Sequence, residues 1–208
     1  MKNLDLIEIF TKSFNLLKDN FSSIAYLILG LLLLSTLGIW FNTDAPNPLY
    51  LLINVVISIF INYALVKTIL RLVNHQAVEF KDLNLNISEL LKYLAIDLLY
   101  GLLVIGGLIL LIVPGIYFAI KYFFAGLILL DKKQSIKASW NASAKLTQGR
   151  KLKLLPILLI NMLAIGLTEA FVSRFVSPYL SSLISIFWQI LFLAVTVEIY
   201  HKFEAKKR

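Results

Sequence analysis

One lysine stands out as a residue that could do chemistry, because it lies inside a long uncharged and apolar stretch. Lys121 follows the Pro114–Gly115 pair by about seven residues, or roughly 10 Å of helix. A charge at such a depth in a membrane costs about 2.5–3.5 kcal/mol, so its side chain should face a bundle interior or a water-filled cleft. Amides near the middle of other apolar runs match this depth: Asn62, Asn161 and Gln189.

These four side chains form a candidate polar site with two readings. In the first, they are hydrogen-bonding glue between helices, where each contact contributes about 0.6 kcal/mol on average. In the second, they bind a solute or a lipid headgroup near the middle of the membrane. The sequence leaves both readings open.

Signatures of catalysis are nearly absent from the chain. No nucleophile elbow, zinc-protease helix or phosphate-binding loop occurs in it. The two histidines, His75 and His201, are far apart, and the lack of cysteine excludes thiolate catalysis and Cys-zinc sites. We therefore expect a protein that is not an enzyme, with no catalytic residue, no metal and no cofactor.

The composition is that of a membrane protein. Hydrophobic residues make up 59% of the chain and charged residues 15%, with a mean hydropathy of +0.83. Soluble domains average about 45–50% apolar and about 25% charged residues. The formal charge of +8 is spread between long apolar runs, where basic residues would meet anionic lipid headgroups. We expect those headgroups, and no nucleic acid, as partners.

The uncharged runs predict an all-α integral membrane protein with six transmembrane helices in one domain spanning residues 1–208. The first, from Phe21 to Thr43, is long enough to cross a hydrocarbon core of about 30 Å. Pro114 and Gly115 predict a tight turn between the third and fourth spans, with one long kinked helix as the alternative. The expected spans cover residues 21–42, 47–68, 92–112, 114–130, 152–171 and 177–199.

Three amphipathic segments, 3–19, 76–92 and 131–149, are predicted to lie at the membrane interface. The first places Leu6, Ile7, Phe10, Phe14 and Leu17 on one helical face. In the third, Ser135 is a candidate N-cap, Gly149 a candidate C-cap, and Ile136, Trp140 and Ser143 an inward face. Basic residues surround that interfacial Trp140: Lys132, Lys133, Lys137, Lys145, Arg150 and Lys151.

The distribution of Lys and Arg predicts the orientation. One side collects the N-terminus, the 67–92 and 131–153 linkers and the C-terminal tail, whereas the other side has only Arg174. By the positive-inside rule the rich side is cytoplasmic, so we expect both the N- and C-termini to be cytoplasmic.

A motif in the middle of the chain resembles a known bacterial family. It comprises Pro114, Gly115 and Tyr117, a basic residue at Lys121, and then Ser143, Leu146 and Gly149 followed by Arg150 and Lys151. The pattern is similar to that of the glycerophosphodiester phosphodiesterase membrane-domain family and its YciC-like relatives. The resemblance implies a multi-pass protein of the bacterial plasma (inner) membrane and assigns no catalytic residue.

Two functions are consistent with these features. The first is a non-enzymatic membrane protein associated with the envelope and its lipids, or acting as the subunit of a membrane or cytoplasmic protein partner. The alternative is a transporter or exporter component for amphiphilic peptides or lipids, with its polar site around Lys121.

Overall fold

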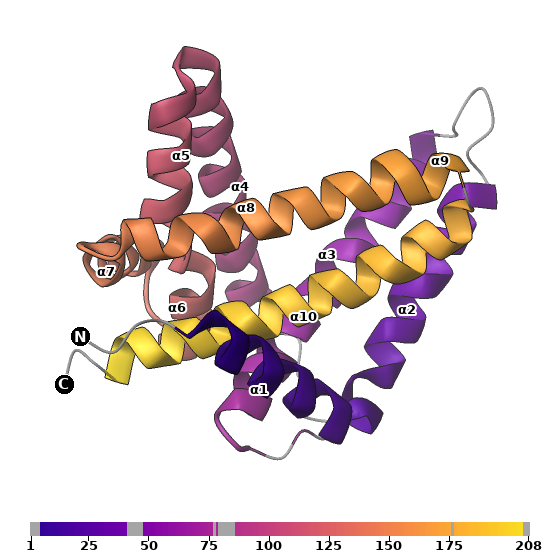
Figure 1. The fold of residues 1–208 in the computed structure, drawn as a ribbon, viewed down its shortest axis with the longest axis horizontal. Helices are drawn as coiled ribbons and strands as arrows, with labels where there is room; N and C mark the ends of the chain where they lie inside the picture. The colour runs from indigo at the N-terminus through magenta and orange to yellow at the C-terminus, as the bar shows by residue number, and fades with distance from the viewer. Residues whose placement is uncertain (1–4, 41–47, 77, 79–85, 176, 206–208) are drawn as a thin grey trace. The chain divides into compact units, whose positions relative to one another are not determined.

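The computed structural model describes residues 5–40, 48–76, 78, 86–175 and 177–205, and every regular element within these ranges is helical (Figure 1). The chain divides into two compact units. Unit 1 comprises residues 1–83 and 159–199, and unit 2 comprises residues 84–158 and 200–208. Two long helices, α8 (Lys151–Leu167) and α10 (Pro178–Ala205), contribute residues to both units.

Among the described residues, five helical runs are long and apolar enough to cross a membrane, or six if a bent pair counts as one. The bent pair is α1 (Leu6–Asp19) with α2 (Phe21–Trp40), which meet at 89°. The chain is thus an all-helical, multi-pass membrane protein, as predicted. The other candidates are α3 (Pro48–Val73), α4 (Ile87–Leu110), α5 (Ile112–Lys121) with α6 (Ala125–Lys132), α8 continued by a π-helical turn (Thr168–Val172), and α10.

In unit 1, helix α1 packs one narrow stripe against the protein. Its buried residues are Ile9, Ser13 and Leu17, while Ile7 of the predicted apolar face is 80% exposed. Apolar residues occur on more than one stripe of this helix, and only packing decides which stripe meets protein. The connection between the first two predicted spans lies outside the described residues.

In unit 2, helix α4 begins five residues before the predicted span start at residue 92. It starts at Ile87 because the side chain of Asn86 accepts a hydrogen bond from the Glu89 N–H and caps the first turn. Most of the predicted 76–92 interfacial segment before Asn86 lies outside the described residues. The end of the last predicted span also differs, because α10 continues to Ala205, past the expected end at residue 199.

The turn between α4 and α5 falls at Leu111, three residues before the predicted Pro114–Gly115 turn. Leu111 is extended, with φ −163° and ψ 146°, and Pro114 lies inside the first turn of α5, where a missing N–H costs nothing. Gly115 serves close packing: a Cβ there would lie 2.5 Å from the side chain of Leu108. The two helices therefore form a tight hairpin (Figure 1).

Helices α6 and α7 (Ile136–Thr147) complete unit 2. The predicted N-cap of α7 is confirmed, because the Ser135 hydroxyl accepts a hydrogen bond from the Ala138 N–H. The C-cap is Gln148, one residue before the predicted Gly149, which follows with a left-handed φ of 72°. Helix α6 is buried almost all round, so this part of the predicted fourth span packs against protein. Its buried residues are Ala125, Leu127, Ile128, Leu129 and Leu130.

Candidate functional site

An apolar groove in unit 1 is a candidate binding site. Its volume is about 350 Å³, within the usual range of small-molecule pockets, and Lys18 is its one charged lining residue. On α2 the lining residues recur at helical spacing, so one face of that helix forms a wall. The groove is lined by Phe14, Leu17, Lys18, Phe21, Ile24, Ile28, Leu32, Leu183, Ile186, Phe187 and Ile190.

Contacts between α1 and α10 hold these two groove-lining helices together. The Lys12 ammonium lies 2.9 Å from a carboxylate oxygen of Glu198, whose side chain is largely buried. Nearby, Phe10 stacks on Trp188 at 6.2 Å between ring centroids, and Phe14 meets Phe187 edge-on at 6.5 Å. Since a buried carboxylate needs a partner, the ion pair fixes α1 against α10.

Three of the four predicted polar-site residues lie in unit 1, and each amide has a protein partner. Gln189 donates from Nε2 to Oδ1 of Asn62 at 3.1 Å, joining α10 to α3. The Trp188 indole N–H donates to Oδ1 of Asn161 at 3.1 Å, joining α10 to α8. Contacts between helices account for these amides without a solute. Lys121 belongs to unit 2.

The backbone around Lys121 is supported by hydrogen bonds from α7. Helix α5 ends at Lys121, and α6 begins only at Ala125, so backbone groups at this break need partners from elsewhere. The Ser143 hydroxyl donates to the Lys121 carbonyl at 3.1 Å and accepts from the Phe124 N–H at 3.2 Å. The Thr147 hydroxyl donates to the same carbonyl at 3.1 Å. Two small hydroxyl side chains thus bridge the interruption.

The Lys121 side chain joins a cluster of aromatic rings and cations. Its ammonium lies 5.0 Å from the ring centroid of Tyr122, and the Lys151 ammonium lies 3.6 Å from that of Tyr117. Trp140 packs on Tyr122 with centroids 4.5 Å apart. Cations over aromatic faces are mutually stabilising, and this mixture is typical of membrane–water interfaces.

The remaining predicted interfacial residues divide into paired and exposed ones. Arg150 donates to the Phe203 carbonyl at 2.9 Å and lies over its ring, and Lys132 pairs with Glu204. Lys133 ends α6 with a left-handed φ of 48°, while Lys137 and Lys145 are exposed. The inward face of α7 is covered by the protein at Ser143 and Leu146, which are buried.

The residues of the family-like motif occupy structural positions in unit 2. Pro114 and Gly115 shape the hairpin, Tyr117 lies under a lysine, Ser143 bridges the helix break, and Gly149 ends α7. Within the described part of the chain, no group of three or more His, Asp and Glu residues is placed to hold a metal ion.

Comparison with known proteins gives no relative: no family model, curated protein or solved structure matches the chain.

Sequence reasoning missed the groove in unit 1. The signal was present, because Phe21, Ile24, Ile28 and Leu32 follow one another at intervals of three and four residues. In a helix that is apolar all round, such an interval does not distinguish a groove wall from an ordinary lipid-facing stripe. The 89° bend between α1 and α2 sets α1 across this wall, and the bend is a tertiary feature.

Proposed function

We propose that the protein is a non-enzymatic integral membrane protein that binds a lipid of its own membrane in the unit 1 groove. The observation that carries this proposal is the groove's chemistry: ten apolar side chains and one lysine. An acyl chain fits the apolar walls, and each buried CH₂ group contributes about 0.8 kcal/mol. Lys18 supplies attraction for an anionic headgroup, which contributes about 1 kcal/mol near a membrane surface.

The proposed setting is the bacterial plasma membrane, with both termini on the cytoplasmic side. The excess of Lys and Arg on one side of the predicted topology supports this orientation. Under it, α1 lies in the cytoplasmic interface, and its 89° angle to α2 suits a helix parallel to the membrane beside one that crosses it. Membership of the glycerophosphodiester phosphodiesterase membrane-domain family is part of the proposal and rests on the motif.

A groove-filling variant tests lipid binding. Native mass spectrometry of the protein extracted with its lipids should find a bound anionic phospholipid on the unmodified chain. Ile28→Trp fills the groove and should reduce lipid occupancy at least several-fold. Leu29→Trp is the matched control, because Leu29 is the next residue of α2, is 59% exposed and does not line the groove.

The headgroup contribution is tested separately. Lys18→Gln should lower retention of anionic lipids more than that of zwitterionic lipids, whereas Lys137→Gln, an exposed lysine of α7, should leave both unchanged. Equal lipid occupancy in Ile28→Trp and the unmodified chain would reject the groove as the binding site. A bound amphiphilic peptide in place of lipid would favour the alternative function of a transporter or exporter component.

A further inference from the structure

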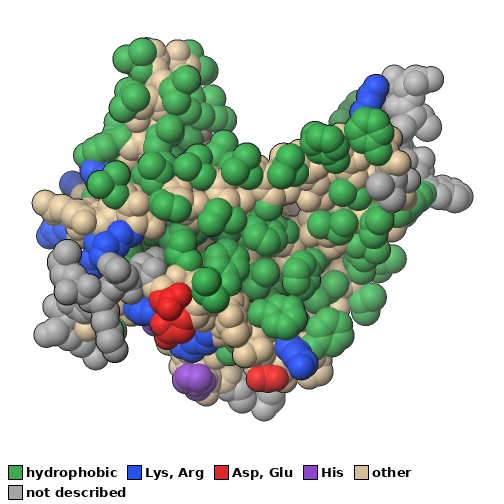
Figure 2. Space-filling view, viewed as in Figure 1, with side chains coloured by type: hydrophobic (Ala, Val, Ile, Leu, Met, Phe, Trp, Pro, Cys, Tyr) green, Lys and Arg blue, Asp and Glu red, His purple; other side chains and the backbone are tan. Residues whose placement is uncertain are grey.

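The turn of the α4–α5 hairpin is an exposed, wholly aliphatic surface. Its five consecutive residues are 68–80% exposed: Ile109, Leu110, Leu111, Ile112 and Val113. Between Asp97 and Lys121 the hairpin contains no charged residue, and its surface is almost continuously hydrophobic (Figure 2). If both helices crossed the bilayer completely, this aliphatic turn would stand in water on the far side.

The uncharged arms of the hairpin are short for a full crossing. From Asp97 to Leu110, α4 rises by about 20 Å, and from Ile112 to Lys121, α5 rises by about 14 Å. The hydrocarbon core of a bilayer is about 30 Å thick. The hairpin therefore reaches about half to two-thirds of the way across when its charged residues remain near the surface.

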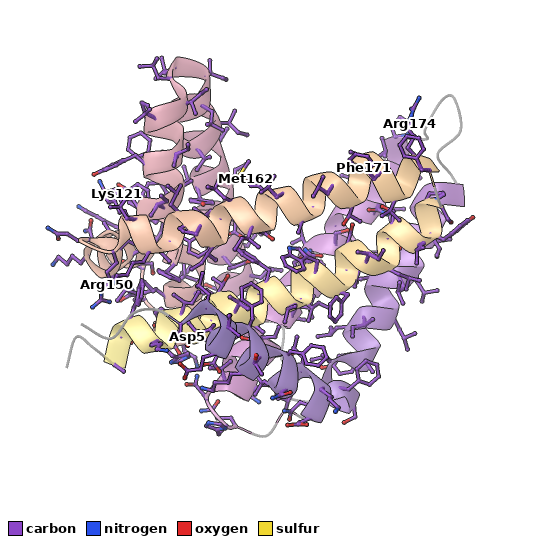
Figure 3. The ribbon with its side chains drawn as sticks, viewed as in Figure 1. Asp5, Lys121, Arg150, Met162, Phe171 and Arg174 are labelled. Atoms are coloured by element: carbon purple, nitrogen blue, oxygen red, sulfur yellow. The ribbon has the colours of Figure 1, made fainter. Side chains whose placement is uncertain are left out.

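The base of the hairpin has the composition of a membrane interface. The Tyr100 hydroxyl donates to the Ala119 carbonyl at 3.0 Å. This hydrogen bond joins the two arms within three residues of Asp97 and Lys121, on the side toward the turn. Tyr117 and Tyr122 lie there beside the ammonium groups of Lys151 and Lys121. Lys121 lies at the foot of α5, at the end away from the turn (Figure 3). Tyrosines and snorkelling lysines mark the headgroup level.

The sequence of two other segments between apolar helices provides a contrast. The segment from residue 41 to 47 contains Asn42, Thr43, Asp44 and Asn47, and the segment from 173 to 177 contains Ser173, Arg174 and Ser177. Both have the polar residues expected of a turn that reaches water, and the α4–α5 turn has none.

Two backbone N–H groups of the hairpin turn are hydrogen-bonded within it, and such pairing matters in an apolar environment, where unpaired polar groups are costly. Leu111 is its one non-helical residue, and its N–H donates to the Gly107 carbonyl at 3.0 Å. The Gly115 N–H donates to the Leu111 carbonyl at 3.4 Å, and Pro114 has no N–H that needs a partner.

We propose that α4 and α5 form a re-entrant hairpin, which enters one leaflet, turns within the hydrocarbon and returns to the same surface. The partner of its aliphatic turn is the acyl-chain region of that leaflet, and the partners of Lys121 and Lys151 are anionic headgroups. The assignment of this leaflet to the cytoplasmic side rests on the proposed orientation. The orientation itself is unchanged, because replacing two crossings by none leaves both flanking segments on one side.

Cysteine labelling tests the hairpin directly, because the chain has no cysteine of its own. A membrane-impermeant maleimide is applied to intact cells and to inside-out vesicles carrying single-cysteine variants. Leu111→Cys should be unreactive in both and become reactive only after denaturation in SDS. Arg174→Cys should react in cells, and Asn141→Cys, an exposed position of α7, only in vesicles. The two controls report the orientation independently of the hairpin.

A spin label at the same cysteine measures its depth. In lipid nanodiscs, the label at position 111 should collide at least several-fold more often with oxygen than with a water-soluble nickel complex. Labelling of Leu111→Cys in intact cells would show a complete crossing and overturn the proposal. Reaction in vesicles alone would place the turn outside the membrane, and a label reached by neither collision partner would bury it in protein. Either result would also reject a lipid-facing turn.

Discussion

Two helix pairs, α4–α5 and α8–α10, have similar apolar character but are joined by opposite kinds of turn. The first is joined by the single extended residue Leu111 with aliphatic neighbours, and a Cβ added at Gly107 would come within 2.8 Å of the Gly115 backbone. The second is joined through α9 (Ser173–Phe175), which contains Arg174, and Gly166 of α8 has nothing within 4 Å of an added Cβ. By hydropathy α4, α8 and α10 each qualify as a membrane span, and so does α5 continued by α6. The polarity of the turn is what distinguishes a helix pair that crosses the membrane from the proposed hairpin.

A charge placed in each turn should give the largest difference in stability between the two helix pairs. In Leu111→Arg the guanidinium would have to enter the hydrocarbon, which costs about 2.5–3.5 kcal/mol. Phe175→Arg, next to Arg174 and 73% exposed, should cost almost nothing. Reversible unfolding in lipid bicelles measures both variants, and equal stabilities would mean that the two turns have the same surroundings.

Close packing within the hairpin should give the next largest effect. Gly115→Ala puts a methyl group 2.7 Å from the backbone nitrogen of Leu108, so α4 and α5 must separate, at a cost of about 2 kcal/mol. Gly166→Ala in α8 and Gly106→Ala in α4 meet no atom within 4 Å. These two controls should stay within about 0.5 kcal/mol of the unmodified protein, or exceed it because alanine favours helix.

Removing the hydroxyl groups of α7 that contact the backbone near Lys121 should have an intermediate effect on stability. Ser143→Ala removes a donor to the Lys121 carbonyl and leaves the buried Phe124 N–H without its acceptor, so unfolding should become easier by about 1.5 kcal/mol. Thr147→Val removes a donor alone and should cost less. Hydrogen exchange at the Phe124 amide checks the mechanism, since only Ser143→Ala should accelerate it.

Replacing Gly149, just after α7, should give the smallest change in stability. Gly149→Ala forces an alanine to adopt a φ of 72° in an open position, so the expected cost is the backbone penalty of about 1 kcal/mol. Thermal unfolding of the variant measures it. A Gly149→Asn variant should recover part of the loss, because asparagine tolerates left-handed backbone, and a larger loss in Asn than in Ala would contradict this explanation.

The sequence by itself determined the features that follow from local physics. The long apolar runs predicted membrane helices, and the hydroxyl of Ser135 specified the start of α7. Gly149 marks the left-handed backbone that follows the helix, one residue after its C-cap. An unpaired amide in an apolar environment is costly, and Asn62, Asn161 and Gln189 each have a protein partner.

Only the tertiary structure decided which surfaces meet. Pro114 was expected at the turn, but a proline also fits the first turn of a helix. In the structure Leu111 is the extended residue, and Gly115 packs closely against Leu108. The groove in unit 1 depends on the bend between α1 and α2, and the bridge from Ser143 to the Lys121 carbonyl joins residues 22 positions apart. Local patterns fix where a helix starts and which side chains need partners. The partner itself is set by packing between distant segments, which no local pattern contains.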